Sequence, residues 1–478
     1  MIRKVLKFAI ALVLSMSVTA YAEAEETVLI KNARIVDVEA GTTSPPQSVL
    51  IEGARIAEVG PEIAGPDAPA TVLDAEGGFL IPGLWDSHVH IFSSQDEPDL
   101  ALPLYMINGI TAIRDMGALV PIEQQQALQA KIAAGEVLGP QLILSGAWVD
   151  ASPGSWPGMF LADTPEEARS VVERIDAEGW AAVKAYSMLN EATYRSLASA
   201  ARDVGLPLVG HIPERVTLDT AIKAGHVGME HFGRITMACS TREAEMVDAL
   251  RQAMAEGAEL SDIFGLMADR NAIVLGSWDA HLCADVLGRM ARAGMYVSPT
   301  LIVADFYTGN WPAADAPRMQ MVPSAVREAW GKPDFRLEAM TDEVRALAEE
   351  SIALDRRTFL LAHEAGVPIL ASSDASFANP YLFHGFSLLD ELDIYVAAGL
   401  TPREALFTAT VAPARFFSLP NQDGTIAPGQ RADLVLLDDN PLESLATLRA
   451  PRAVVVGGTV LDRAELDRMT DELLAAAE

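Results

Sequence analysis

Cysteine is scarce in this chain. Its 478 residues include only two, Cys239 and Cys283. This number excludes a small disulfide-rich scaffold. An exported protein could oxidise the pair to a disulfide, and two buried thiols are equally consistent with the sequence, because sequence does not give the distance between the two side chains. Neither cysteine lies near the N-terminus, which argues against a lipoprotein.

Positive charge is also scarce. The chain has 35 lysines and arginines against 66 aspartates and glutamates, and its formal net charge is −31. So acidic a surface repels nucleic acid and anionic membranes. We therefore expect no nucleic-acid partner, and a homo-oligomer is compatible with the sequence.

The one long apolar run, from Phe8 to about Ala20, is shorter than the ~20 residues that span a bilayer. Basic residues precede it, and Ala20-Tyr21-Ala22 places small residues where a signal peptidase cleaves. We predict a signal peptide over residues 1–22, with export to the periplasm as the expected destination. A single membrane anchor is the alternative. After cleavage we expect no stable membrane insertion.

Short β-rich segments with glycine turns occupy both ends of the mature chain, at residues 23–82 and 421–463. Each is too short to bury a core alone. We therefore predict that they combine into one small β-sandwich, with a large domain inserted between them. The last residues, 464–478, are predicted to form a helix.

Residues 83–420 alternate short apolar strands with amphipathic helices. Eight such units predict an α/β fold of the (β/α)₈ TIM-barrel type. The predicted strands are 83–90, 109–115, 141–146, 181–186, 206–211, 228–232, 295–301 and 367–374, and the predicted helices include 121–134, 164–178, 190–204, 241–256 and 341–366. Two long aromatic connections, 146–163 and 304–339, are expected to cover the active site.

Potential metal ligands lie at the ends of the predicted strands. His88 and His90 are two residues apart, so both project to one side of the first strand. Three further strands end near His211, His231 and Asp374. Active sites of (β/α)₈ barrels are built at these strand ends, and imidazole with carboxylate suits Zn²⁺, Mn²⁺, Co²⁺ or Fe²⁺.

Lys184 stands in the apolar strand AAVKAY, where burial of an unpaired charge would be expensive. It either reaches water or an acid, or reacts with CO₂ to form a carbamate that bridges two metal ions. Tyr186, two residues further, points to the same side and is a candidate for binding the substrate carbonyl. His384 is a second candidate for lining the substrate pocket. Arg114 and Asp115 are expected to form a structural pair.

The chain resembles the amidohydrolase superfamily, close to its imidazolonepropionase-like and Xaa-Pro dipeptidase-like branch. The matching motifs are GLWDSHVH, GITAIRDMG, VKAY, VGHIP, GMEHF, SPTL, SSDAS and the tail GTIAPGQRADLVLLDDNPL. The resemblance implies two divalent metal ions, zinc first among the candidates. His88, His90 and Asp374 would hold one ion, His211 and His231 the other, and carbamylated Lys184 would bridge them.

The resemblance further implies hydrolysis by a hydroxide held between the metals, with Asp374 as the catalytic proton carrier. The expected substrate is a dipeptide or an N-acyl amino acid with an amide C–N bond. Hydrolysis of a cyclic amide, lactone or carbamate, or deamination, is the alternative on the same fold. The stretches HIPE, GMEH and SSDAS contain no GxSxG nucleophile elbow.

Overall fold

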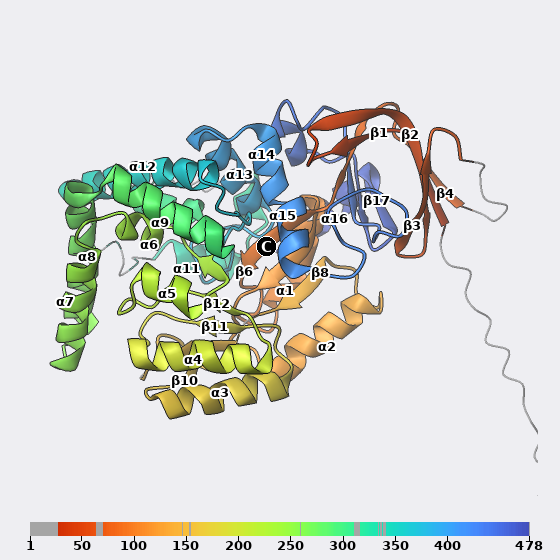
Figure 1. Cartoon of the computed structure of the whole chain (residues 1–478). Coiled ribbons are helices and arrows are strands. Elements are labelled where there is room, and N and C mark those ends of the chain that lie inside the picture. The colour runs from red at the N-terminus through yellow and green to blue at the C-terminus, as the bar shows by residue number, and fades with distance from the viewer. Residues whose placement is uncertain are drawn as a thin grey trace, which may run out of the picture.

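The computed structural model describes residues 27–477 apart from 64–69, 146, 153, 259, 310–315, 333, 335–336 and 338–340. The predicted signal peptide lies outside the described residues. The chain has a mixed α/β fold with a β-rich unit at its N-terminus (Figure 1). Within the described residues, none of the helices is both long enough and apolar enough to cross a membrane.

The β-rich unit takes strands from both ends of the chain (Figure 1). β5 (Phe79–Pro82) joins them, since it pairs in parallel with β1 (Thr27–Asp37) and antiparallel with β15 (Leu434–Leu437). The other strands of this sheet are β2 (Thr42–Glu52), β3 (Arg55–Gly60), β4 (Ala70–Asp74), β16 (Ala453–Val456) and β17 (Thr459–Asp462).

These eight strands form one hydrogen-bonded sheet, whereas we predicted a sandwich of separate sheets. Register shifts in the pairing of β1 with β2, between Ile30 and Ala33 and between Arg34 and Val36, are irregularities of the kind that bend a strand. Apolar side chains of β1, β2, β3, β5, β15 and β16 share a single buried cluster. The one sheet therefore curls around its own core.

The larger unit holds parallel strands in two groups. β6 (Leu84–Val89), β7 (Ile110–Asp115) and β8 (Gln141–Leu144) form the first group. The second contains β10 (Phe160–Leu161), β9 (Ala147–Asp150), β11 (Val183–Ala185), β12 (Leu208–Gly210), β13 (Gly228–Glu230) and β14 (Tyr296–Ser298), in that order. β8 and β9 are separated by only two residues, so the chain passes directly from one group to the other.

The predicted strand 367–374 is not a regular strand. Only isolated bridges mark it, Val297 with Ile369 and Val89 with Ala375. Backbone hydrogen bonds still reach both neighbouring strands, since Leu370 N–H donates to the Val297 carbonyl and Asp374 N–H donates to the His88 carbonyl, each at 2.8 Å. Ser373 instead donates to the Asp86 side chain through both its backbone N–H (3.0 Å) and its hydroxyl (2.5 Å). The segment nevertheless lies between β14 and β6.

Helices follow the strands and pack on their outer side (Figure 1). Where the sequence predicted a helix one is present; α3 (Pro165–Glu178), for example, begins with a capping box of Thr164 and Glu167. The others are α1 (Glu97–Ile107), α2 (Ile122–Ala133), α4 (Glu191–Val204), α5 (Leu218–Ala224), α6 (Gly233–Ala238), α7 (Glu243–Ala255), α8 (Leu260–Ser277), α9 (Ala280–Ala293), η1 (Leu301–Thr308), α10 (Pro317–Gln320), α11 (Ser324–Trp330), α12 (Asp342–Glu364), α13 (Phe386–Ala398), α14 (Pro402–Thr408), α15 (Val411–Phe417), η2 (Leu445–Arg449) and α16 (Arg463–Ala476). The C-terminal helix α16 packs on α1 and ties the last residues to the larger unit.

Cys239 and Cys283 form a disulfide between the end of α6 and α9. Both residues are fully buried. The sequence left the disulfide and the pair of free thiols open, and the structure shows the former. The bond spans 44 residues of sequence and fixes the helix that directly follows His231.

Removing this disulfide should destabilise the folded chain by about 2–4 kcal/mol, because the unfolded chain regains the freedom of the closed loop. We expect Cys239→Ser/Cys283→Ser to melt at a lower temperature than the wild type under oxidising conditions. A reducing agent should lower the wild-type midpoint to that of the variant and leave the variant unchanged. Equal midpoints of wild type and variant without reductant would contradict this assignment.

Candidate metal centre

The predicted ligands come together at the carboxyl ends of the parallel strands. His88 lies in β6, and His90 is the first residue after this strand. His211 directly follows β12, and His231 directly follows β13. Lys184 lies in β11, and Asp374 lies in the irregular segment beside β6. Five elements distant in sequence thus supply one site.

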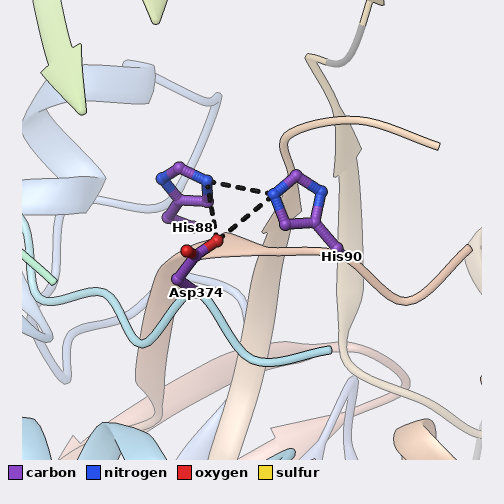
Figure 2. A group of neighbouring side chains, drawn as sticks. All are labelled: His88, His90 and Asp374. Carbon is purple, nitrogen blue, oxygen red and sulfur yellow. Dashed lines mark hydrogen bonds and ion pairs between the residues drawn. The ribbon is translucent and has the colours of Figure 1, made fainter. Parts of the chain in front are cut away.

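His88, His90 and Asp374 form the tightest group (Figure 2). The two Nε2 atoms are 3.2 Å apart, and each lies 3.3 Å from Asp374 Oδ1. Two nitrogens about 2.1 Å from one tetrahedral ion would be roughly 3.4 Å apart. The three atoms therefore have the spacing of one face of a metal's coordination shell, and this donor set fits a divalent ion.

His211 and His231 form a second pair beside the first. Their Nε2 atoms are 3.1 Å apart, a spacing that equally fits two ligands of one ion. The rings of His88 and His231 have centroids 5.2 Å apart, so the two groups are neighbours. Burial lowers the pKa of both His88 and His211 well below the usual imidazole value, which keeps these rings neutral and able to ligate a metal.

Each of the four rings is fixed by its other nitrogen. Nδ1 of His88 contacts Glu230 Oε2 at 2.9 Å, and Nδ1 of His90 lies 2.8 Å from the carbonyl oxygen of Gly117. The partners of the remaining two Nδ1 atoms are hydroxyls, Ser187 Oγ at 2.9 Å for His211 and Thr300 Oγ1 at 2.7 Å for His231. Such outer contacts set the ring orientation and the tautomer of metal-binding histidines.

The backbone is strained at this site. Asp374, His231 and Thr300 have φ values of 57°, 65° and 46°, in the left-handed region that side chains other than glycine rarely adopt. Two of these residues are predicted ligands and the third holds one of them. Strain of this kind persists only where the surroundings enforce it, and it concentrates at functional sites.

Lys184 is the remaining predicted ligand, and it is 1% exposed. Burial lowers the pKa of its amine to about 8. The Nζ atom lies 5.3 Å from the centre of the Trp148 ring and 5.8 Å from that of Tyr186. A partly neutral amine in such a place can react with CO₂, so the geometry is compatible with the carbamate that the sequence suggested.

A cavity of about 330 Å³ opens at this centre. Its aromatic side is built by Trp148, Trp156 and Tyr186, so the connection 146–163 lies over the site as predicted. Trp156 Nε1 donates to the Tyr186 hydroxyl at 2.9 Å, and the Tyr186 ring stacks on His211 with centroids 4.3 Å apart. Of the second predicted connection, 304–339, no described residue lines this cavity, although Val303 directly before it does. Trp311 and Phe335 lie outside the described residues.

His384 does not lie at this cavity. It is fully buried, with Nε2 at 2.9 Å from Glu97 and Nδ1 at 2.8 Å from the Tyr105 hydroxyl. The sequence predicted contact with substrate only from its position shortly after Asp374. Because both ring nitrogens are already engaged, the structure gives His384 a structural place instead.

The predicted pairing of Arg114 with Asp115 is wrong. Successive residues of a strand point to opposite sides. Arg114 donates to Glu230 at 2.8 Å, whereas Asp115 accepts from the backbone N–H groups of Ile91 and Gly117 at 2.8 and 3.0 Å. Arg114 and Glu230 thus form a buried ion pair that extends to His88.

Sequence reasoning missed the roles of Glu230 and Asp86. Glu230 orients His88, and Asp86 holds the Asp374 segment through Ser373. Burial raises the pKa of Asp86 to about 7. A signal was available for each, since both are acids inside apolar strands and stand one or two residues before a predicted ligand.

Replacing Glu230 should weaken metal binding without removing a ligand. In Glu230→Gln the amide no longer offers a carboxylate to His88 Nδ1 and Arg114, so we expect a loss of about 10- to 100-fold in metal affinity. Metal titration of the metal-free protein measures it. Glu58→Gln, an exposed site in β3, is the matched control. Equal affinities of the two variants would contradict the orienting role.

Comparison with known proteins agrees with this geometry. The profile of the Amidohydrolase family matches residues 79–461. Adenine deaminase 3 of Rhizobium meliloti is 24% identical over 418 residues, which cover 86% of this chain and 54% of that protein. The match thus covers most of this chain but only about half the length of the curated relative.

Solved structures show the same fold. The bottromycin amidohydrolase superposes with a TM-score of 0.71 at 21% identity, covering 94% of this chain and 90% of that one. A Xaa-Pro dipeptidase with bound methionine gives a TM-score of 0.63 at 19% identity, covering 91% of this chain and 100% of that one. The resemblance predicted from the sequence motifs is confirmed: the chain belongs to the amidohydrolase family.

Proposed function

We propose that this protein is an exported hydrolase of an amide or peptide C–N bond that works with two divalent metal ions. The observation that carries the proposal is the convergence of four imidazole Nε2 atoms and one carboxylate oxygen, with every Nδ1 held from outside. The proposed ligands are His88, His90, Lys184, His211, His231 and Asp374. Zinc is the first candidate ion, since imidazole and carboxylate are its common ligands.

The proposed architecture is a (β/α)₈ barrel. Strand pairing runs from β6 through β7 to β8. The chain passes from β8 to β9 within two residues, and pairing continues from β9 through β11, β12 and β13 to β14. The bridges at Ile369 and Ala375 then lead back to β6. A closed order with helices outside supports the barrel, and its carboxyl-end face is where such enzymes carry their active sites.

We propose that Lys184 carries a carbamate. Its neutral amine would add to CO₂ with loss of one proton, which turns a buried base into an anionic oxygen ligand. An anion would be favoured by the cations that bind beside it, and it would remove the unfavourable burial of a lone ammonium group. Divalent manganese, cobalt or iron in place of zinc would stabilise the carbamate anion in the same way.

When bound, the metal ions would supply water of near-neutral pKa and polarise the substrate carbonyl. The chain's own residues then handle the proton. Burial alone would raise the pKa of Asp374, but the nearby His88 and His90 lower it below its usual value, so the carboxylate is ionised. It can accept a proton from the attacking water and pass it to the leaving amine. Tyr186 lines the same cavity, and we propose that its hydroxyl donates to the substrate carbonyl.

The surroundings of the site favour a substrate with one apolar and one charged part. The aromatic side of the cavity suits an apolar acyl or aryl group. His211 and His231 also line a second cavity of about 360 Å³, whose charged side chains include Glu214 and its ion-pair partners Arg234 and Arg270. A dipeptide or an N-acyl amino acid has this division, and the structural likeness to a Xaa-Pro dipeptidase agrees with it.

Deamination is the second candidate. Most of the matching curated relatives are named adenine deaminases, among them one from Klebsiella pneumoniae that is 37% identical over 173 residues. Another, from Carboxydothermus hydrogenoformans, is named dihydroorotase and is 50% identical over 62 residues. Cyclic amides, lactones and carbamates belong to the same alternative. Ammonia release from adenine would favour deamination, and release of a free amino acid would favour the peptide or acyl substrate.

Export is proposed from the N-terminal segment and from the disulfide. A buried disulfide is typical of proteins that fold in an oxidising compartment. The periplasm would provide such a compartment. Localisation of a tagged full-length chain by cell fractionation would test this part separately from the chemistry.

A panel of dipeptides, N-acyl amino acids, cyclic amides, lactones and adenine tests the reaction. We expect the metal-loaded enzyme to release amino acids from one of the first two classes. Chelation should abolish turnover, and the metal should restore it. No turnover of any dipeptide or N-acyl amino acid would rule out the proposed substrate class.

The variant Asp374→Ala should lose about 10²–10⁴-fold in turnover, since it removes the proton carrier. Metal content should fall only in part, because four imidazoles remain. Asp439→Ala, at an exposed position, is the matched control and should keep wild-type turnover. Wild-type turnover in Asp374→Ala would show that the measured activity does not arise at this site.

A further inference from the structure

A further large cavity, distinct from the two described above, lies at the amino ends of the parallel strands. It has a volume of about 470 Å³ and opens beside the starts of β11, β12, β13 and β14. The proposed metal ligands lie in β11 or beyond the carboxyl ends of β12 and β13, so this cavity is separate from the proposed active site. Neither the family assignment nor the proposed function accounts for it.

Three aromatic residues form its apolar wall. Phe416 and Phe417 lie at the end of α15, and Tyr296 begins β14. The ring centroids of Phe416 lie 4.8 Å from Tyr296 and 5.0 Å from Phe417. All three residues are half-buried and line the cavity. Such a wall suits a flat apolar group.

One buried cation provides the polar part of this cavity. Arg114 lines it and is 1% exposed. Its Nε donates to the Ser87 carbonyl, and its Nη2 donates to Glu230 and Ser298. Its Nη1 donates to no described residue. Nη1 is not among the buried atoms that lack a partner, so its N–H groups are open to an acceptor in the cavity. A carboxylate is an acceptor that a guanidinium binds strongly.

We infer that this cavity binds a small aromatic carboxylate, with the ring against Phe416 and Phe417 and an oxygen on Arg114. The position has a consequence for the metal centre. The same guanidinium holds Glu230 at 2.8 Å, and Glu230 holds His88 at 2.9 Å. The occupant of the cavity would therefore contact Arg114, which holds the carboxylate that orients a proposed metal ligand.

Fluorine NMR with 4-fluorophenylacetate tests the inference directly. The probe should bind to the folded protein in a saturable way. The size-matched cation 4-fluorobenzylamine should bind at least about tenfold more weakly, a difference of about 1.4 kcal/mol. This comparison is strict, because the net charge of −31 attracts the cation and repels the carboxylate. Equal binding of both probes would overturn the role of Arg114.

Two variants locate the bound probe. Ala181 lines the mouth of the cavity and is exposed, so Ala181→Trp should fill the opening and weaken binding at least about tenfold. Trp156→Ala alters the proposed active site and should leave the affinity unchanged. Val227→Phe, also at the cavity, replaces Ala181→Trp if that variant fails to fold.

No saturable binding to the wild type, or binding lost in Trp156→Ala alone, would overturn the inference. The readout is binding and requires no turnover. A failure here is therefore distinct from a failure of the proposed hydrolase.

Discussion

The site depends on one constraint, the fixing of four imidazole rings by the nitrogen that faces away from the centre. A carboxylate, a backbone carbonyl and two hydroxyls hold the four Nδ1 atoms, so every Nε2 atom turns inward. A free imidazole ring rotates readily and can present either nitrogen. With these partners in place, the rings are organised before any ion arrives.

The surrounding fold is arranged to provide these partners. Glu230 belongs to β13. One of its carboxylate oxygens contacts His88, and the other forms an ion pair with Arg114 of β7. Thr300 and Asp374 hold strained left-handed backbone conformations that place one partner and one ligand. Breaking a buried ion pair by removing one member is strongly destabilising, so Arg114 and Glu230 act as a unit. The disulfide after His231 adds a covalent restraint near the same ligand.

The α/β fold and part of the metal centre could be predicted from the sequence, because both follow from the spacing of residues along the chain. Alternating strands and helices give the α/β fold, and the two-residue spacing of His88 and His90 gives two rings on one side of β6. Family membership followed from short motifs. Each of these features depends on neighbours in the chain.

Features that depend on distant residues could not be predicted. The segment 367–374 is apolar and strand-like in sequence, yet its Ser373 donates both its backbone N–H and its hydroxyl to Asp86, almost three hundred residues away. His384 stands near Asp374 in sequence but pairs with Glu97. Arg114 pairs with Glu230 in place of its neighbour Asp115. We predicted a β-sandwich, but the structure has one curled sheet. Its curvature depends on register shifts between β1 and β2, whose positions could not be predicted from the sequence.

Metal content per protomer tests the central claim most directly. Elemental analysis would be made on enzyme purified with bicarbonate, beside Lys184→Ala as the variant without the bridging group. The account predicts close to two ions in the wild type and a clear loss in the variant. One ion in both proteins would contradict the bridged centre, leave Lys184 without a role as a ligand and move deaminase or cyclic-amide chemistry to the front.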